Sequence, residues 1–231
     1  MLETLPLFPL GTVLLPGALL PLHIFEPRYR QLTTDLVMGV VPDRTFGVVA
    51  VRPGWNTEDG VAEAVYGVGC SAQLQDAQRR PDGRFDIVSR GMRRFALREM
   101  DPTPAPYLTA TVEWLPDFDE SAQRDGQGAP ALPATLVQAA RGAHHRYCTL
   151  AWQHDDWMPP RGDVDPAVLA HVLAADCLLT VDDRQALLEQ QSPVRRLRMV
   201  RSMVTREAEF LRTLNAVPAP ADRLTPQLHR N

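Results

Sequence analysis

The sequence predicts an α+β protein, with a β-rich part over residues 1–115 followed by an all-helical part over residues 134–215. Two observations carry this prediction. Short β-branched or alternating runs repeat as far as Leu115, whereas apolar residues at helical spacing dominate the second part. Between the two parts, residues 116–133 show no periodicity and are rich in Gly, Pro and acidic side chains. That composition is typical of a linker or long loop.

The first stretch, "LPLFPLGTVLLPGALLPLHIFEPRYRQL" (residues 5–32), is apolar but suits neither a signal peptide nor a membrane span. A signal peptide begins with basic residues, and no Lys or Arg precedes Arg28. A spanning helix needs about 20 apolar residues without breakers, and Pro recurs every few positions. We therefore expect a soluble, cytoplasmic protein that opens with short strands at residues 4–8, 12–16 and 18–25. Pro21 within the third strand indicates a sheet edge or a bulge.

The rest of the N-terminal part is expected to be mostly strand. A helix should begin at Pro27 and end at Gly39, since Pro suits the first helical turn and Gly the C-terminal stop. A buried strand is predicted over residues 44–52. The runs 64–80 and 84–100 flank the turn tripeptide "PDG" and therefore predict a hairpin. A further alternating strand is predicted over residues 107–115.

Four helices are predicted in the C-terminal part, at residues 133–148, 165–179, 182–191 and 192–215. The last is long and amphipathic, because its apolar residues form one stripe at helical spacing. The Pro-rich tail over residues 216–231 is expected to be flexible.

Composition excludes several kinds of chemistry. The sequence contains 24 Arg and no Lys. A P-loop, a Schiff base and a Ser-Lys dyad all require a Lys, so none of them can be built from these residues. The three cysteines, Cys70, Cys148 and Cys177, are widely spaced with no CxxC pair, which argues against a disulfide framework and indicates a reducing compartment.

The opening stretch closely resembles the signature of the N-terminal, substrate-binding domain of Lon proteases. Later stretches fit the same pattern in the same order: "FGVV" (46–49), "YGVGCSAQL" (66–74), "DGRFDIVSRGMRRFALRE" (82–99) and "DDRQALLE" (182–189) with the long helix after it. The resemblance covers residues 5 to about 214. It implies a β-rich pseudo-barrel of the PUA-like kind followed by a helical bundle.

In full Lon proteases this domain helps to capture substrate proteins, and ATPase and protease domains follow it. The resemblance, together with the missing Lys, therefore implies a free-standing LON domain that hydrolyses neither ATP nor peptides.

Metal binding and catalysis are not expected. His144, His145, Cys148 and His154, with Asp155 and Asp156, form the one cluster of metal-ligating residue types. However, adjacent His144 and His145 point about 100° apart on a helix. Ser89 lacks the GxSxG context of a nucleophile, and Cys70 and His23 are expected to be structural. We therefore predict no catalytic residue, no metal and no cofactor.

Nucleic-acid binding is the alternative function, because PUA-like folds include RNA binders. Arg90, Arg93 and Arg94 cluster in the sequence, and so do four Arg residues between positions 195 and 201. An RNA-binding surface is usually basic and rich in aromatic side chains, but this chain has a net charge of −4 and 6% aromatic residues. We expect no membrane partner and leave the oligomeric state open.

The function favoured by the sequence is non-enzymatic recognition of exposed apolar segments of client proteins, with a protease or chaperone as a further partner. Trp55 stands among turn-forming residues, so it is a candidate anchor for a client or, equally, a lid on one barrel end. Trp152 and Trp157 pose the same choice. Phe8, Phe25 and Tyr29, which belong to the Lon-like signature, are expected in the core.

Overall fold

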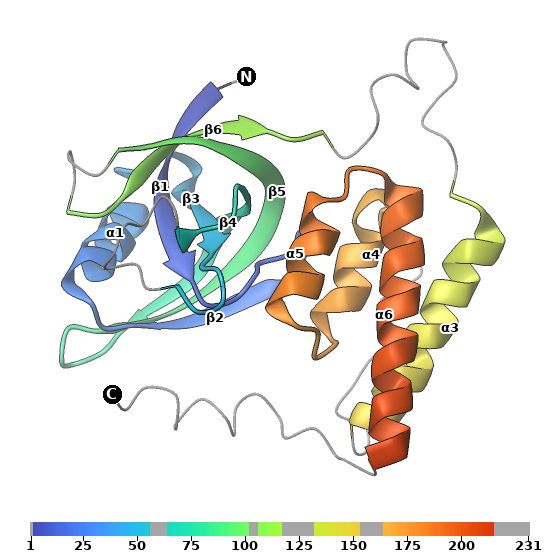
Figure 1. Cartoon of the computed structure of the whole chain (residues 1–231). Helices are drawn as coiled ribbons and strands as arrows, with labels where there is room; N and C mark the ends of the chain where they lie inside the picture. Colours follow the sequence, from blue (N-terminus) through green and yellow to red (C-terminus); the bar gives the residue numbers. More distant parts are fainter. Residues whose placement is uncertain (1, 56–63, 102–105, 117–131, 153–163, 215–231) are drawn as a thin grey trace.

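The structure, a computed structural model, describes residues 2–55, 64–101, 106–116, 132–152 and 164–214. Figure 1 shows a strongly curved sheet beside a group of helices. The strands are β1 (Leu2–Leu10), β2 (Leu19–Ile24), β3 (Thr45–Ala50), β4 (Val68–Arg79), β5 (Phe85–Asp101) and β6 (Thr109–Trp114). The helices are α1 (Pro27–Met38), the short η1 (Pro42–Arg44), α3 (Ala134–Ala151), α4 (Pro166–Ala175), α5 (Val181–Glu189) and α6 (Pro193–Leu214).

The strands form one mixed sheet that closes on itself. Its order is β2-β5-β4-β3-β1-β6. An additional β5–β6 pairing closes the strands from β5 to β6 of this order into a ring, and β2 lies outside it. The 17-residue β5 makes this closure possible, because its first half pairs with β2 and its second half pairs with β6. β1 and β3 run parallel, whereas the other pairs are antiparallel. The predicted α+β class with a β-rich, barrel-like N-terminal part is confirmed.

Most predicted elements are present, and α1 illustrates why. It begins at Pro27 and ends before Gly39, whose φ of 76° lies in the left-handed region that Gly adopts freely. The predicted hairpin is also present, since β4 and β5 flank the "PDG" turn. Gly83 in that turn likewise has a positive φ, of 81°.

The strand predicted over residues 12–16 is wrong. These residues form a loop between β1 and β2, although Val13, Leu14 and Leu15 in it are buried. The loop packs against the backbone of β5 at Gly91, where an added Cβ would lie 2.2 Å from the carbonyl oxygen of Leu15. Burial of an apolar run therefore did not require pairing in the sheet.

Pro21 lies in β2, which pairs with β5 and has no second partner among the described strands. The edge position predicted for Pro21 is therefore observed, and it suits a residue that lacks a backbone N–H.

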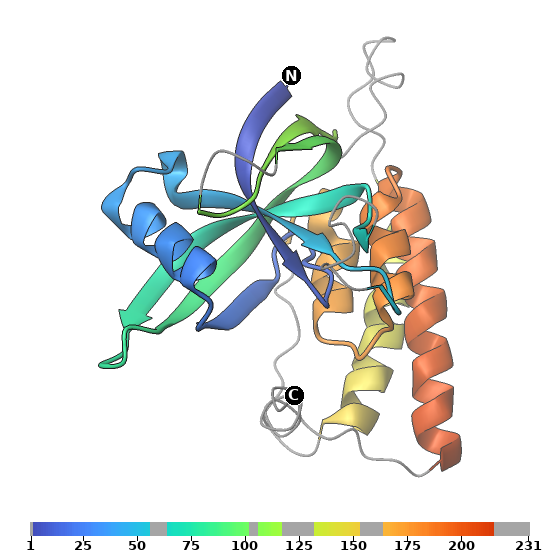
Figure 2. The ribbon, with the colours of Figure 1, turned by 60° about the vertical axis from the view of Figure 1, so that its left-hand side comes forward.

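The helical part joins the barrel through α5, which Figures 1 and 2 place on the side that faces the strands. The Gln185 amide donates to the carbonyl of Val68 in β4 at 3.1 Å. The Tyr66 hydroxyl donates to Asp182 at the start of α5 at 2.6 Å. α3 and α6 pack on each other further from the barrel.

Two fully buried arginines complete this junction between barrel and helices. Arg94 of β5 donates to the carbonyl of Leu188 at 3.0 Å and to that of Pro116 at 2.6 Å. Arg196 of α6 donates to the carbonyl of Gln190 at 3.2 Å. The buried His171 of α4 lies 3.4 Å from the carbonyl of Leu187. The C-terminal carbonyls of α5, which a helix leaves without internal partners, are thus bound by side chains from three other elements.

One large hydrophobic core runs from the barrel into the helices. It contains Phe46 and Leu74 from the strands together with Leu169 and Leu197 from the helices. A smaller cluster around Phe95 lies on the opposite face of the strands, since Leu7 and Val49 belong to it while their neighbours Phe8 and Val48 belong to the larger core. The predicted linker at 116–133 and the tail at 216–231 fall almost wholly outside the described residues, so the proposed division at these positions stays a prediction. Among the described helices, none is long and apolar enough to cross a membrane.

Candidate functional site

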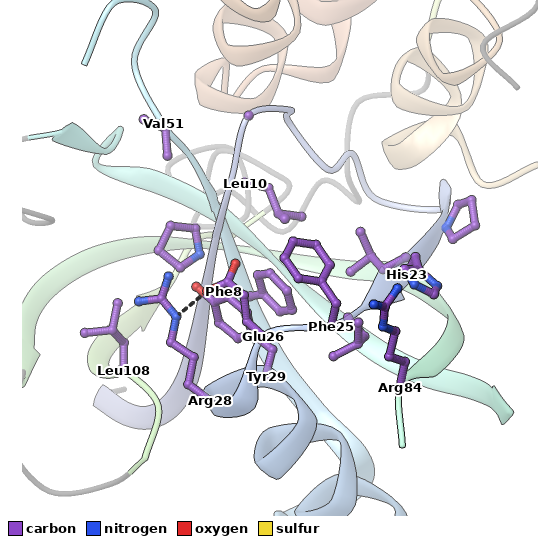
Figure 3. A pocket seen from close by; sticks show the side chains of 15 residues that line it. Phe8, Leu10, His23, Phe25, Glu26, Arg28, Tyr29, Val51, Arg84 and Leu108 are labelled. Atoms are coloured by element: carbon purple, nitrogen blue, oxygen red, sulfur yellow. Dashed lines mark hydrogen bonds and ion pairs between the residues drawn. The ribbon is translucent and has the colours of Figure 1, made fainter. Parts of the chain in front are cut away.

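An open groove of about 800 Å³ is hollowed into the described surface. It lies where the C-terminal end of β1, the edge strand β2 and the start of α1 meet (Figure 3). Most of its walls come from the Lon-like opening stretch. The lining residues are Phe8, Pro9, Leu10, Gly11, Pro21, Leu22, His23, Ile24, Phe25, Glu26, Arg28, Tyr29, Val51, Arg84 and Leu108.

Stacked aromatic rings form the floor of the groove. The rings of Phe8 and Tyr29 are nearly parallel, at 9°, with centroids 3.8 Å apart. The guanidinium of Arg28 lies over the same Tyr29 ring, 4.6 Å from its centroid. Burial raises the pKa of the Tyr29 hydroxyl to about 12, so it stays neutral at physiological pH. Phe8 and Tyr29 are buried, as the sequence predicted.

Phe25 differs from the other two aromatic residues because 49% of its surface is exposed. Its expected place in the core is therefore wrong. It follows the last residue of β2 and precedes Glu26, the N-cap of α1, so neither element covers it. Figure 3 shows the three aromatic side chains between Arg28 on one side and Arg84 on the other. An exposed aromatic side chain in a concave apolar site offers area that a bound segment can cover.

The rim of the groove is polar and held by ion pairs. Arg28 donates to the Glu26 carboxylate at 2.9 Å. On the opposite side, the His23 ring bonds to Asp86 at 2.7 Å, and Arg80 pairs with the same carboxylate. The bonds from His23 and Arg80 lower the pKa of Asp86. The rim charges are thus paired with each other, so the rim carries no strong single sign toward a ligand.

Two prolines shape what the groove can bind. In β1, the N–H of Leu7 points to Leu108 and the carbonyl of Leu10 points to Val51 beside β3. Because successive residues of a strand alternate, Pro9 turns its backbone away from β3 and toward the open side. Pro21 occupies the edge strand on the other wall. Neither residue has an N–H to donate, so an added β-strand would pair poorly here. The geometry favours recognition of side chains over extension of the sheet.

The groove has little to offer catalysis. Among the lining residues there is no Ser, Thr or Cys, and the one His is engaged with Asp86. In the part of the chain that the structure describes, no group of three His, Cys, Asp or Glu side chains is placed to hold a metal ion. An apolar hollow with paired charges at its rim can bind an apolar ligand.

The predicted anchors lie elsewhere. Trp55 is 52% exposed and stands four residues beyond Val51 of the groove wall, in the loop after β3. Trp152, at the end of α3, is half-buried and packs against the main core. Trp157 lies outside the described residues. The structure therefore brings neither Trp55 nor Trp152 into the groove lining.

Sequence reasoning missed Phe25 and the groove around it. One signal was available: Phe25 falls between the end of a strand and the N-cap of a helix, where an aromatic residue has no regular neighbours to cover it. The remaining walls could not be found this way, because Leu10, Ile24 and Leu108 are far apart in sequence. They meet only when the ring closes.

Each of the two predicted Arg clusters has a member buried at the junction: Arg94 in the first and Arg196 in the second. They are therefore not available to a surface ligand.

A closed mixed barrel with an apolar groove, braced by a helical part, defines a binding domain. The chain belongs to the LON substrate-binding domain family: the model of the ATP-dependent protease La (LON) substrate-binding domain matches residues 4–206. The resemblance seen in the opening stretch is thereby confirmed. In Lon proteases this domain is the substrate-binding module and not the catalytic one.

The relatives are full Lon proteases. The chain is 27% identical to Lon protease 2 of Myxococcus xanthus over 93% of its own length, and 28% identical to Lon protease of Desulfovibrio desulfuricans over 90%. These matches cover 25% and 22% of the two relatives. The chain thus spans about a quarter of the length of the curated relatives it matches.

Two solved structures share the fold. A Lon N-terminal domain protein from Xanthomonas campestris aligns with a TM-score of 0.57 at 24% identity, covering 94% of this chain and 99% of that one. The N-terminal domain of Mycobacterium avium complex Lon protease aligns with a TM-score of 0.60 at 16% identity, covering 88% and 98%. Both support the α+β architecture described above.

Proposed function

We propose that this chain is a non-enzymatic module that recognises exposed apolar segments of client proteins in the cytoplasm, without ATPase or peptidase activity. The observation that carries the proposal is the open groove of about 800 Å³ with exposed Phe25 at its centre, in a chain of a substrate-binding family. Such a groove binds by burying apolar area, so it tolerates many sequences and binds each of them weakly.

The occupant we propose is an apolar or aromatic side chain of a non-native client, with its backbone lying across the prolines of the two walls. Pro9 and Pro21 restrict strand pairing, so affinity comes from the side chain. The arginine-flanked rim leaves the ends of the client segment in water. Trp55 remains a candidate second anchor, with Trp152 and Trp157 as further candidates, and a protease or chaperone receives the client.

The test uses an unfolded, carboxymethylated client protein with a fluorescent label, titrated with the purified chain. Phe25→Ser should weaken binding about tenfold, because burying a Phe side chain contributes roughly 1.5–3 kcal/mol. The matched control is Phe210→Ser: Phe210 is a similarly exposed Phe on α6, and its replacement should leave the affinity unchanged. Trp55→Ala reports on the second anchor.

Four outcomes decide between the proposed function and its alternative. Binding that Phe25→Ser weakens and Phe210→Ser does not supports the groove. Equal losses in both variants would place binding elsewhere, and no binding to any unfolded client would sink the proposal. Retention of RNA with an affinity that falls steeply as salt rises would instead support the alternative function. ATP and peptide turnover should both be absent in parallel assays.

A further inference from the structure

A second groove, of about 440 Å³, lies between the barrel and the helices. One wall comes from the barrel: the loop after β1, the first residues of β2, and Arg90 of β5. The other wall comes from the helical part and includes Val172 of α4, Asp176 just after α4, and Arg184 of α5. The described lining residues of this second groove and of the groove around Phe25 do not overlap. The two hollows are therefore separate sites.

The loop in the barrel wall is held between β5 and α4. The N–H of Gly17 donates to the carbonyl of Gly91 in β5 at 2.8 Å, and the N–H of Gly91 donates to the carbonyl of Ala18 at 2.8 Å. Gly17 also lies against α4, because a Cβ added to it would be 3.1 Å from Cγ2 of Val172. The fold itself thus fixes this wall, and a site that is already ordered costs less entropy to fill.

Two arginines from different elements line the second groove. Arg90 is exposed on β5 opposite Leu19 of β2, so these two side chains lie on the same face of the sheet. Arg184 is half-buried, and it donates one amino group to the carbonyl of Cys177 at 2.9 Å. Burial lowers the pKa of Arg184, since a guanidinium is costly to take out of water. Within the described ranges neither guanidinium forms an ion pair, so both have N–H groups to offer an anion.

Asp176 is the one carboxylate among the described lining residues, and it already has a partner. Its carboxylate lies 3.4 Å from Nε2 of His144, a buried residue of α3. Burial would lower the pKa of His144, but its bonds with Asp176 and Cys148 raise it to about 9. At neutral pH this imidazolium offsets the charge of Asp176. The second groove therefore keeps the positive charge of Arg90 and Arg184, in a chain whose net charge is −4.

We propose that the second groove binds a small molecule that carries a phosphate group. A phosphate monoester has a charge of about −1.5 to −2 at pH 7 and three acceptor oxygens, which suits two guanidinium groups on two walls. A planar carboxylate is better matched to a single bidentate arginine. The exposed Thr12 hydroxyl is a further donor in the lining. Leu19, Val172 and Ala175 offer apolar area to the rest of the molecule.

The experiment titrates n-butyl phosphate into the purified full chain by calorimetry, at constant ionic strength and pH 7. Inorganic phosphate should bind more weakly, because it leaves the apolar wall uncovered. Butyrate should bind at least about tenfold more weakly than butyl phosphate, because it has less charge and fewer acceptor oxygens. Butyrate that binds as tightly as butyl phosphate overturns the phosphate assignment. Absence of butyl phosphate binding overturns the proposal as a whole.

Arg90→Gln should weaken butyl phosphate binding about tenfold, because it removes a charge-assisted hydrogen bond. Arg201→Gln is the matched control: Arg201 is exposed on α6 outside the lining, and its replacement changes the net charge equally. Unchanged affinity in Arg90→Gln, or equal losses in both variants, overturns the proposal. Arg184→Gln should also weaken binding. Because this variant loses a bond to Cys177 as well, urea denaturation checks its fold, and Arg90→Gln decides the question if that fold is lost.

The inference does not depend on the client-binding groove, and Phe25→Ser separates the two sites. Phe25 does not line the second groove, so this variant should bind butyl phosphate with the wild-type affinity. Binding of butyl phosphate that Phe25→Ser weakens and Arg90→Gln does not would place the ligand in the first groove and overturn the proposal.

Discussion

Two regions of the molecule differ in which side chains they bury: the junction between the barrel and the helices, and the aromatic groove. At the junction, Arg94, Arg196 and His171 are fully buried, and each contacts a carbonyl near the end of α5. In the groove, Phe25 is exposed although it is apolar. Burial of polar groups is costly unless they are paired, and exposure of aromatic area is costly in water. The junction therefore stabilises the fold, whereas the groove leaves aromatic area open to a ligand.

The largest expected effect is at the junction. Arg94→Met removes the donor to Leu188 and Pro116 and leaves two carbonyls without it. We expect a loss of about 3 kcal/mol in the free energy of unfolding, measured by urea denaturation, because each unpaired buried polar group costs about 1–3 kcal/mol. The neighbouring Arg93 is exposed and lies over the Trp114 ring, so Arg93→Met should cost less than about 1 kcal/mol. Equal losses of unfolding free energy in Arg94→Met and Arg93→Met would contradict the role given to the buried arginine.

The next effect is a pH dependence at the junction. Burial and the nearby Arg196 lower the pKa of His171 to about 3. Since the unfolded chain binds this proton near pH 6.5 and the folded chain does not, stability falls as the pH drops below about 6.5, until about pH 3. Between pH 7 and pH 5 the wild type should lose about 2 kcal/mol relative to His171→Gln. A His171→Gln slope equal to the wild type would contradict the assignment.

A smaller effect is expected at the start of α5. The Thr180 hydroxyl accepts a bond from the N–H of Asp183 at 3.1 Å and caps the helix that joins the two parts. Thr180→Ala should cost about 1 kcal/mol in chemical denaturation, the usual contribution of an N-cap. The Thr213 hydroxyl near the end of α6 donates to the Glu209 carbonyl of its own helix, so Thr213→Ala should change stability little. The contrast fails if both variants lose the same amount.

The smallest effect on stability is expected in the groove. Phe25→Ser should change the free energy of unfolding by less than about 0.5 kcal/mol, as exposed positions usually do. Thermal or urea unfolding of this variant accompanies the binding titration. A large loss of stability would mean that Phe25 holds the fold, and the reduced binding would then say nothing about recognition.

Much of the fold could be predicted because its signals are local. "PDG" specifies the β4–β5 turn, and Pro27 and Gly39 delimit α1, without help from distant residues. The loop over residues 12–16 was mistaken for a strand because an apolar run shows burial but not pairing. Its burial depends on contact with Gly91, which the sequence places about 75 positions away.

The site was harder to predict because it depends on which side chains of a strand are buried and which are exposed. Arg94 and Arg93 are adjacent and identical in the sequence, yet one is buried at the junction and the other is exposed. Their alternation along β5 was visible, but which face meets α5 was not. Phe8 and Phe25 likewise differ in exposure only because β1 is covered by its neighbours and the end of β2 is not.

The edge strand β2 has a consequence for aggregation. A domain that meets unfolded chains risks becoming a template on which their strands assemble into aggregates. Closure of the ring joins β5, β4, β3, β1 and β6 and leaves β2 as the outer strand among those described. Pro21 in the middle of β2 breaks the row of donors that a growing fibril would use. The same residue that limits strand pairing in the groove thus also limits edge-to-edge association of β2 with another chain.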